Sequence, residues 1–365
     1  MSLSRPDTED EGVDFAKVMR RRLVWLVLLV VGLVASAFVA VLVGTLGPIG
    51  PGDPEYISFE EAFGAIFHGQ GDLPDYYANV FWEVRIPRVL LAAAVGAALA
   101  CAGTAMQAVF RNPMADPFIV GVSSGASLGA VVASLTGLAS IAVLGALMTP
   151  TLAFASALLT VFVVYYLGVV GGKVYVNTLL LSGVAVAAFL GAMVSLLIYF
   201  AGQQYHRIIF WMLGSLSMAS WTAVIVVVLA AVLGIVLVYI SSRDLNALLL
   251  GEETAHNLGV DAEGLKTLML VVAAVMTAAA VAFTGVIGFV GLIIPHMLRL
   301  VVGADHRILV PAATLSGAIF LIWADTVARA VIAPTELPVG IITALCGGPF
   351  FLYLLRRNRI LGDAL

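Results

Sequence analysis

The chain has 365 residues, of which 62% are apolar and only 11% are charged. A soluble domain carries about 25% charged residues, so a water-soluble globule of this length would have a largely apolar surface. The formal net charge of −4 provides no basic face, and together these properties exclude an ordinary soluble enzyme, a disordered chain and a nucleic-acid-binding protein. We therefore expect a protein whose main solvent is lipid.

The apolar residues form long runs with the length of membrane spans. A membrane-spanning helix needs about 20 mostly apolar residues, and we predict ten spans at 23–46, 88–109, 117–137, 141–168, 176–200, 221–241, 265–284, 286–302, 308–331 and 338–355. A shorter apolar piece at 206–217 predicts a re-entrant or surface helix. The sequence thus predicts an all-α membrane protein with about ten transmembrane helices.

The positions of lysine and arginine predict the orientation, because these residues concentrate in cytoplasmic loops. With a cytoplasmic N-terminus, four of the 18 basic residues fall outside, namely Arg85, Arg88, Arg207 and Arg329. The other fourteen fall inside and are Arg5, Lys17, Arg20, Arg21, Arg22, Arg111, Lys173, Arg243, Lys266, Arg299, Arg307, Arg356, Arg357 and Arg359. An even number of spans returns the chain to its starting side, so we predict two cytoplasmic termini.

The polar segments define the domain organisation. We predict an acidic cytoplasmic tail at 1–22, a single polytopic transmembrane domain at 23–358 and a second cytoplasmic tail at 359–365. The domain has a long external loop at 47–87 and a long cytoplasmic connection at 241–266.

The first span has an alternative interpretation as a cleaved secretion signal. Arg20–Arg22, an apolar run and the small residues at 35–37 are typical of such signals. The apolar run continues to about Leu46, which is too long for the hydrophobic part of a signal and favours a retained helix.

The sequence shows no catalytic or metal-binding constellation. Gly168–Lys173 is superficially similar to a phosphate-binding loop, but Leu167 replaces its first glycine and Val174 replaces its magnesium-binding hydroxyl. The five histidines and two cysteines have no metal-ligand spacing. We therefore predict no catalytic residues, no metal and no cofactor, and we interpret Cys101 and Cys346 as small packing residues.

One carboxylate, Asp325, lies well inside a predicted span. Arg329 follows four residues later on the same helix face, so a structural ion pair is favoured over a proton relay. Glycines at every fourth position over 121–129 predict close helix packing. Glycines at every third position over 285–291, just before Pro295, predict a bent or broken helix.

Several motifs, in this order and spacing, resemble the permease subunits of ABC importers for metal chelates. This is the FecCD-type family, which serves iron-siderophores, haem and vitamin B12. The motifs are Arg85-Ile86-Pro87-Arg88, Met106-Gln107, Arg111–Pro117, Gly121–Gly125, Trp211–Leu216, Leu250–Gly259, Gly288–His296, Ala304–Arg307, Ala324-Asp325 with Arg329, and Glu336–Gly340. The resemblance extends from about residue 85 to 355, and the acidic tail and long external loop depart from it.

The resemblance implies a homodimer in the cell membrane, with the translocation path between two ten-helix subunits. It also implies two cytoplasmic ATP-binding subunits, an external substrate-binding protein and no enzyme activity in this chain. The solute would be a metal chelate, either cobalamin, a ferric siderophore or haem, carried by alternating access. An ion-coupled secondary transporter or channel is the alternative, whereas a membrane enzyme would need catalytic residues that the sequence does not show.

The resemblance also implies roles for three sets of residues. The residues that match arginines docking the binding protein are Arg85, Arg88 and Arg329, for which interfacial anchors are the alternative interpretation. The residues that match contacts with the ATPase are Glu252, Glu253, Thr254, His256 and Asn257, in a predicted short helix ending at Gly259, where a solvated loop is the alternative. The residues that match a cytoplasmic gate are Asn112, Met114, Val176 and Asn177.

Overall fold

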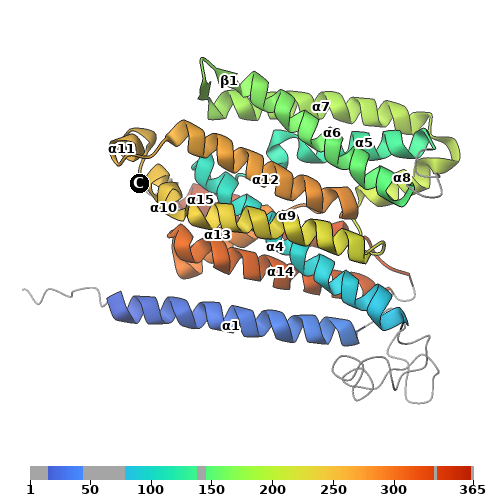
Figure 1. The fold of residues 1–365 in the computed structure, drawn as a ribbon, viewed down its shortest axis with the longest axis horizontal. Helices are drawn as coiled ribbons and strands as arrows, with labels where there is room; N and C mark the ends of the chain where they lie inside the picture. The colour runs from blue at the N-terminus through green and yellow to red at the C-terminus, as the bar shows by residue number, and fades with distance from the viewer. Residues whose placement is uncertain (1–14, 44–78, 138–144, 333–334, 363–365) are drawn as a thin grey trace, which may run out of the picture.

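In the computed structural model, the described residues are 15–43, 79–137, 145–332 and 335–362. They form a bundle of helices with one short β-hairpin (Figure 1). Most of the predicted acidic tail and of the predicted external loop lies outside the described residues.

Within the described part of the chain, ten long helices form the bundle. They are α1 (Phe15–Leu42), α4 (Ile86–Val109), α5 (Val122–Leu135), α6 (Gly145–Gly168), α7 (Val176–Tyr199), α9 (Trp221–Ile240), α12 (Ala262–Thr284), α13 (Val290–Val302), α14 (His306–Ala330) and α15 (Val339–Gly362). The shorter elements are η2 (Val80–Arg85), η3 (Pro117–Val120), β1 (Val169–Val170), β2 (Lys173–Val174), η5 (Gly202–Gln204), α8 (Tyr205–Met212), α10 (Ser242–Leu249) and α11 (Glu252–Asn257).

Each predicted span overlaps one of these long helices. Within the described ranges, seven helices are long and apolar enough to cross a membrane, and α5, α13 and the first part of α15 are shorter apolar helices. The short helix predicted at 206–217 is present as α8. The predicted all-α membrane architecture is therefore confirmed.

Some helix ends differ from the predicted limits. α1 begins at Phe15, inside the predicted tail, and α15 continues to Gly362. Hydropathy marks where a helix leaves the bilayer, whereas helical hydrogen bonding continues as long as the residues favour it. The span predicted at 117–137 is wrong as one continuous helix, because Gly121 adopts a left-handed φ of 85° between η3 and α5.

The centre of the bundle is α4, which crosses between the other helices in Figure 1 and is buried along most of its length. A helix buried all round needs apolar and small residues on every face. A Cβ atom at Gly96 would overlap the Gly317 carbonyl oxygen of α14, and one at Gly103 would overlap that of Gly291 in α13. The glycines of α4 therefore allow direct backbone contact with two neighbouring helices.

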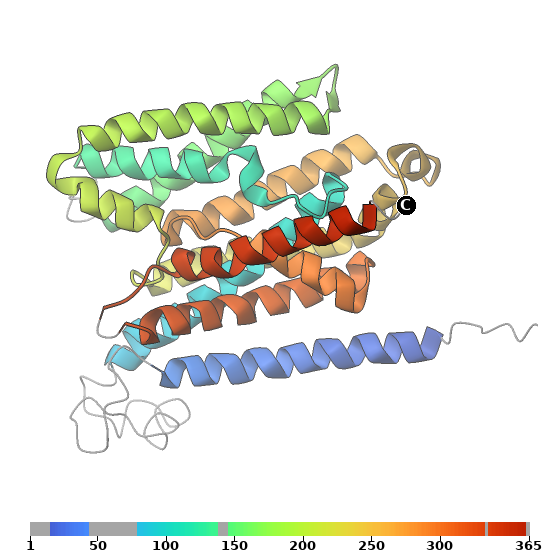
Figure 2. The ribbon, with the colours of Figure 1, turned by 180° about the vertical axis from the view of Figure 1, so that it is seen from behind.

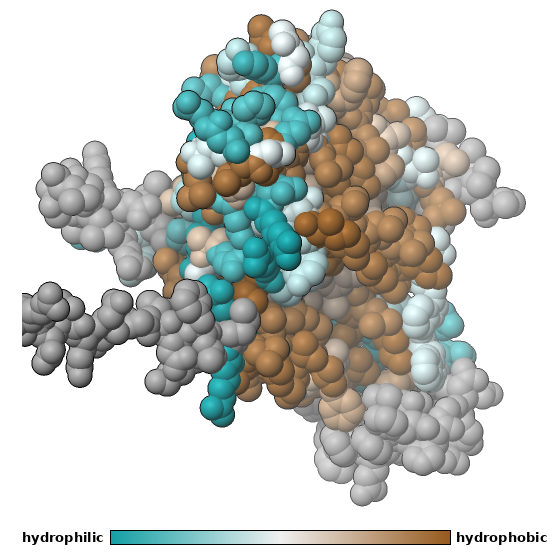
Figure 3. All heavy atoms as spheres, turned by 60° about the vertical axis from the view of Figure 1, so that its left-hand side comes forward, coloured by the Kyte–Doolittle hydropathy of each residue, from teal (hydrophilic) through white to brown (hydrophobic). Residues whose placement is uncertain are grey.

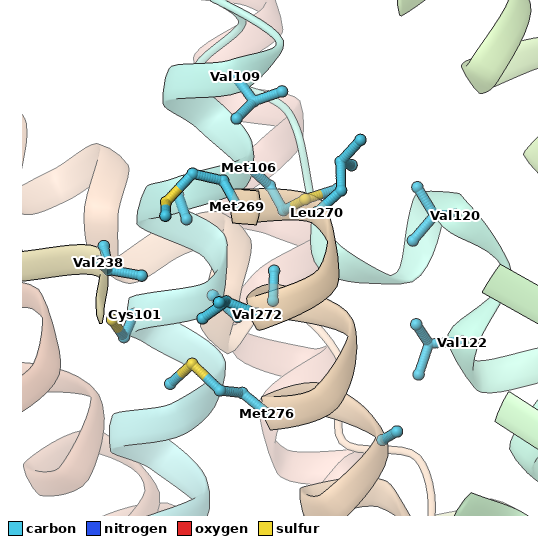
Figure 4. Close-up of a cluster of buried hydrophobic side chains, with 14 of the residues drawn as sticks. Cys101, Met106, Val109, Val120, Val122, Val238, Met269, Leu270, Val272 and Met276 are labelled. Atoms are coloured by element: carbon cyan, nitrogen blue, oxygen red, sulfur yellow. The ribbon is translucent and has the colours of Figure 1, made fainter. Parts of the chain in front are cut away.

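The packing between α4 and α12 uses flexible sulfur-containing side chains. Figure 4 shows Cys101 and Met106 of α4 beside Met269 and Met276 of α12, in one buried hydrophobic cluster. Methionine fills irregular gaps between helices because its side chain is unbranched and polarisable. Cys101 is buried as predicted, but Cys346 on α15 is exposed, so its interpretation as a packing residue is wrong for this single chain.

Both glycine patterns have the predicted consequences. Gly129 of α5 lies directly against the Leu152 backbone of α6, and Gly125 against Thr160 of the same helix. The chain breaks between α12 and α13, where Gly285 and Phe289 have positive φ angles of 70° and 69°. Trp211 lies against Gly285 at this break.

The outer helices expose apolar side chains. Phe162 of α6 is 63% exposed and Leu181 of α7 is 72% exposed, and Figure 3 shows a broad hydrophobic surface with hydrophilic patches near its ends. α1 begins and α15 ends at the same end of the bundle, with α15 on the face seen in Figure 2. This arrangement matches a chain that crosses the bilayer an even number of times.

Candidate functional sites at the two ends of the bundle

At one end, Asp325 lies between two arginines from different helices. Its carboxylate accepts two hydrogen bonds from Arg88, from Nη2 at 2.9 Å and from Nε at 3.0 Å. It also lies 3.1 Å from the Nε of Arg329, which confirms the predicted pair within α14. Arg88 Nη1 binds Glu336 at 2.8 Å, so this guanidinium group holds two carboxylates.

The remaining guanidinium contacts are hydrogen bonds to backbone carbonyls at the C-terminal end of α1. Arg85 donates to the Val41 carbonyl at 3.2 Å, and Arg329 donates to the carbonyls of Val43 at 2.8 Å and Ala40 at 3.2 Å. The last carbonyls of a helix lack partners within the helix and carry partial negative charge. Two arginines therefore cap α1 and attach it to η2 and α14.

These contacts bear on the predicted docking arginines. Arg85, Arg88 and Arg329 are 6%, 6% and 3% exposed, and each has internal partners. These internal contacts give all three arginines a structural role, and docking of a partner stays a prediction. Arg207, the remaining basic residue expected outside, is exposed on α8.

At the opposite end, α10 and α11 occupy the predicted cytoplasmic connection. α11 runs from Glu252 to Asn257 and is followed by Gly259, whose positive φ of 84° agrees with the predicted glycine stop. Its exposed side chains are Glu253, Thr254, His256 and Asn257, and Leu250 and Leu258 next to the helix are also exposed. This exposed polar face between two leucines can contact a partner.

The fifth predicted coupling residue, Glu252, points towards the bundle. Its carboxylate lies 3.3 Å from Lys266 Nζ and 3.6 Å from Arg111 Nη2. Lys266 is 1% exposed, forms an ion pair with Glu263 at 2.7 Å and donates to the Val174 carbonyl at 3.3 Å. Glu263 in turn accepts from the Val174 backbone N–H at 2.8 Å. We refer to Arg111, Glu252, Glu263 and Lys266 as the Lys266 network.

The Lys266 network is next to both parts of the predicted gate. Arg111 directly precedes Asn112, whose side chain accepts from the Met114 backbone N–H at 2.9 Å. Val174 lies two residues before Val176, the first residue of α7. The exposed residues Asn112 and Asn177 thus belong to two chain segments that the network connects to α11.

The segment with partial similarity to a phosphate-binding loop is a β-hairpin. β1 and β2 pair in an antiparallel manner around Gly171 and Gly172, whose φ angles are 59° and 79°. Two positive φ angles are what a tight two-residue hairpin turn requires. The hairpin presents the Val174 backbone to Lys266 and Glu263.

A second polar cluster attaches α10 to α1 and α14. Asn246 donates to Asp305 at 2.8 Å and accepts from the His306 backbone N–H at 2.9 Å, and Arg22 lies 3.3 Å from Asp305. Burial raises the pKa of Asp305, but the Asn246 hydrogen bond, the Arg307 N–H and nearby arginines outweigh it, so the pKa lies below its usual value. Asp305 is therefore an ionised N-cap of α14.

Sequence reasoning missed the Lys266 network and this Asp305 cluster. The spacing of Glu263 and Lys266 is the one local signal, because residues three apart share a helix face. Their partners Arg111, Val174 and Asn246 are far away in the chain. No group of three or more metal-ligating side chains occurs among the described residues.

Comparison with known proteins agrees with this architecture. A sequence model of the FecCD transport family matches residues 52–357. The cobalamin import system permease protein BtuC of Halobacterium salinarum is 50% identical over 291 residues, covering 80% of this chain and 77% of that protein. The hemin transport system permease protein HmuU of Yersinia pestis is 43% identical over 284 residues, covering 77% of this chain and 84% of that protein.

The fold also matches a solved structure, described as a metal-chelate type ABC transporter in an inward-facing conformation. The TM-score is 0.76 at 31% identity, and the match covers 91% of this chain and 98% of that chain. The chain therefore belongs to the FecCD transport family, and it is a multi-pass, non-catalytic membrane permease of the ABC importer type, in which the ATPase is a separate subunit.

Proposed function

We propose that two copies of this chain form the translocation path of an ATP-driven importer for a metal chelate, such as cobalamin, haem or a ferric siderophore. Two cytoplasmic ATP-binding subunits and an external substrate-binding protein complete the importer. The names of the similar cobalamin and hemin permeases support this class of solute.

The observation that carries the proposal is the Lys266 network. ATP-dependent transport requires a mechanical connection between the surface that contacts the ATPase and the part that opens the path. Glu252 lies in α11, whose other polar side chains are exposed. It pairs directly with Arg111 beside Asn112, and Lys266 joins it to Val174, two residues before Val176. Movement of α11 by the ATPase would therefore reach both parts of the gate.

The mechanism that we propose is alternating access. Glu253, Thr254, His256 and Asn257 contact the ATPase, and Glu252 transmits the displacement inward. Asn112, Met114, Val176 and Asn177 then close or open the cytoplasmic side of the path. The broken segment between α12 and α13 offers a non-helical backbone of the kind that lines membrane cavities.

We propose that the binding protein docks at the opposite end, near Arg88 and Glu336. The Glu336 side chain is 25% exposed and is held by the buried Arg88. In this arrangement the docking surface is stabilised by the internal contacts of Arg85, Arg88 and Arg329.

The geometry of Asp325 argues against the alternative, an ion-coupled carrier. A proton or cation relay needs a carboxylate that can exchange its partner during transport. Both oxygens of Asp325 are occupied by Arg88, and Arg329 lies next to them. This carboxylate is thus part of a structural pair.

Replacement of Lys266 tests the coupling. In the complete importer reconstituted in liposomes, Lys266→Met should keep ATPase binding but lower the transport per ATP hydrolysed by at least about tenfold, because the buried link between α11 and Val174 is lost. The matched control is Lys173→Met, because Lys173 is exposed on the neighbouring hairpin. Normal transport by a correctly assembled Lys266→Met importer would rule out the proposed role of the network.

Two further measurements test the function itself. The purified chain alone, in liposomes with an ion gradient, should move no solute, and uptake under these conditions would favour the secondary-transporter alternative. Direct binding of cobalamin, haem and ferric siderophores to the cognate binding protein then identifies the solute. Tight binding of none of these chelates would contradict the proposed solute class.

A further inference from the structure

A groove opens between the first turns of α1 and the last turn of α13. It has a volume of about 750 Å³, and its lining includes Arg20, Arg21, Trp25, Leu28 and Leu300. A smaller hollow of about 390 Å³ shares Arg21, Trp25 and Leu300 with it. We refer to this region as the α1–α13 groove.

The packing of α1 explains why the groove exists. α13 ends at Val302, where Gly303 turns the chain with a φ of 92°. α1 packs against α14, and its N-terminal half is held there by the pair between Arg22 and Asp305. The apolar side chains at the end of α13 are left uncovered, and Leu300 is 62% exposed.

The charges at the mouth of the groove are not balanced within the described part of the chain. Arg20 and Arg21 are exposed, and neither has a carboxylate within ion-pair distance among the described residues. Arg21 donates a hydrogen bond to the Val301 carbonyl, at 3.5 Å. Two guanidinium groups beside an open apolar groove match a phosphate group that carries an acyl chain.

Trp25 indicates where the groove lies along the bilayer normal. Tryptophan is enriched where the hydrocarbon of a membrane meets the headgroups. Trp25 is 39% exposed and lies one helical turn from Arg21, and Leu28 follows on the hydrocarbon side. The arginines are therefore at headgroup level, and the apolar lining is at acyl-chain level.

We propose that the α1–α13 groove binds an anionic phospholipid of the adjacent leaflet. The lipid phosphate lies between Arg20 and Arg21, and one acyl chain packs along Leu28 and Leu300. An anionic lipid is favoured over a zwitterionic one because basic residues at this depth have no internal counter-charge in the described chain. The bound lipid would cover the apolar gap between α1 and α13.

Fluorescence quenching by brominated lipids tests this proposal on the full chain. The protein is placed in phosphatidylcholine bilayers that contain a small, equal fraction of either brominated phosphatidylglycerol or brominated phosphatidylcholine. The contribution of Trp25 is the difference between the wild-type signal and that of Trp25→Phe. We expect the anionic lipid to quench Trp25 at least about threefold more strongly at low salt, and this preference to shrink as salt screens the charges.

Matched variants test whether the stronger quenching of Trp25 by the anionic lipid arises from binding in the α1–α13 groove. The double variant Arg20→Gln with Arg21→Gln should lose it, whereas Arg243→Gln, at an exposed arginine of α10 near the same end, should retain it. Equal quenching by both lipids in the wild type, or a preference that survives in the double variant, would overturn the proposal.

Other occupants give distinguishable results. Loss of the preference on addition of inorganic phosphate at constant ionic strength would indicate a soluble-anion site and overturn the lipid assignment. The acidic residues at 7–14 are a competing occupant in the sequence. If they occupy the groove, the preference will be absent from the wild type and will emerge when their carboxylates are replaced by amides, which would also overturn the proposal.

Discussion

Arg88 shows how a charged side chain is tolerated inside a membrane bundle. Its guanidinium group holds Asp325 with two nearly parallel hydrogen bonds and Glu336 with a third nitrogen. Arg329 neutralises the remaining charge on the pair of carboxylates. A buried ion pair contributes little net stability when complete, but removal of one member leaves an uncompensated charge.

At the residue scale, Arg88→Gln should therefore destabilise the protein. We expect the free energy of unfolding in detergent to fall by about 3–5 kcal/mol, since Asp325 and Glu336 both lose a cationic partner. Arg207→Gln, on exposed α8, is the control and should change little. If Arg88→Gln unfolds like the wild type but no longer binds the substrate-binding protein, direct docking by Arg88 is the correct interpretation.

Close approach of helix backbones is the main feature at the element scale. α4 contacts α14 through Gly96 and Gly317, and contacts α13 through Gly103 and Gly291. Apolar side chains gain little from burial when lipid is the alternative environment, so helix association depends on close contact and packing. Short helices such as α11 cannot be stable in isolation and depend on contacts such as that between Glu252 and Lys266.

A matched pair of glycine variants tests this dependence. Gly96→Ala should lower the free energy of unfolding by about 1–3 kcal/mol or more, because the new methyl group overlaps the Gly317 backbone. Gly32→Ala on α1 should change it by less than about 0.5 kcal/mol, since its Cβ would lie 3.6 Å from Ile319 Cδ1. The free energy of unfolding of each variant is measured in a graded detergent or urea series. Equal stability of the two variants would show that the close contact between Gly96 and Gly317 is dispensable.

On the scale of the whole molecule, the two functional ends are separated by the bundle. α10, α11 and the β-hairpin lie at the end where α1 begins, and α8 lies at the other end (Figure 1). The distribution of lysine and arginine predicts that the end with α11 faces the cytoplasm. The coupling and docking surfaces then face the compartments of their proposed partners.

Accessibility labelling tests this orientation. In a cysteine-free background, Asn257→Cys at the end of α11 should react with an impermeant maleimide in inside-out vesicles, and Gln203→Cys before α8 should react in right-side-out vesicles. Both positions are exposed. The opposite pattern would reverse the predicted topology and with it the proposed places of the partners.

The sequence alone determined the membrane class, the position of each long helix and the helix break near Gly285. These features depend on local composition and spacing, which act within one or two helical turns. The family motifs also predicted the short helix α11, whereas the gate that they imply at Asn112, Met114, Val176 and Asn177 stays a prediction. The pair between Asp325 and Arg329 was predictable because its members lie on one helix face.

Only the tertiary structure decided what the isolated charges contact. Arg88 reaches Asp325 and Glu336 across more than 200 residues of sequence, and Lys266 reaches the Val174 carbonyl across 92. A buried charge takes whichever partner the packing of distant helices brings within about 3–4 Å, and sequence spacing does not encode that proximity. For this reason the sequence could predict that its few charges matter, but it could not predict the burial of Arg85, Arg88 and Arg329 or the contacts of the Lys266 network.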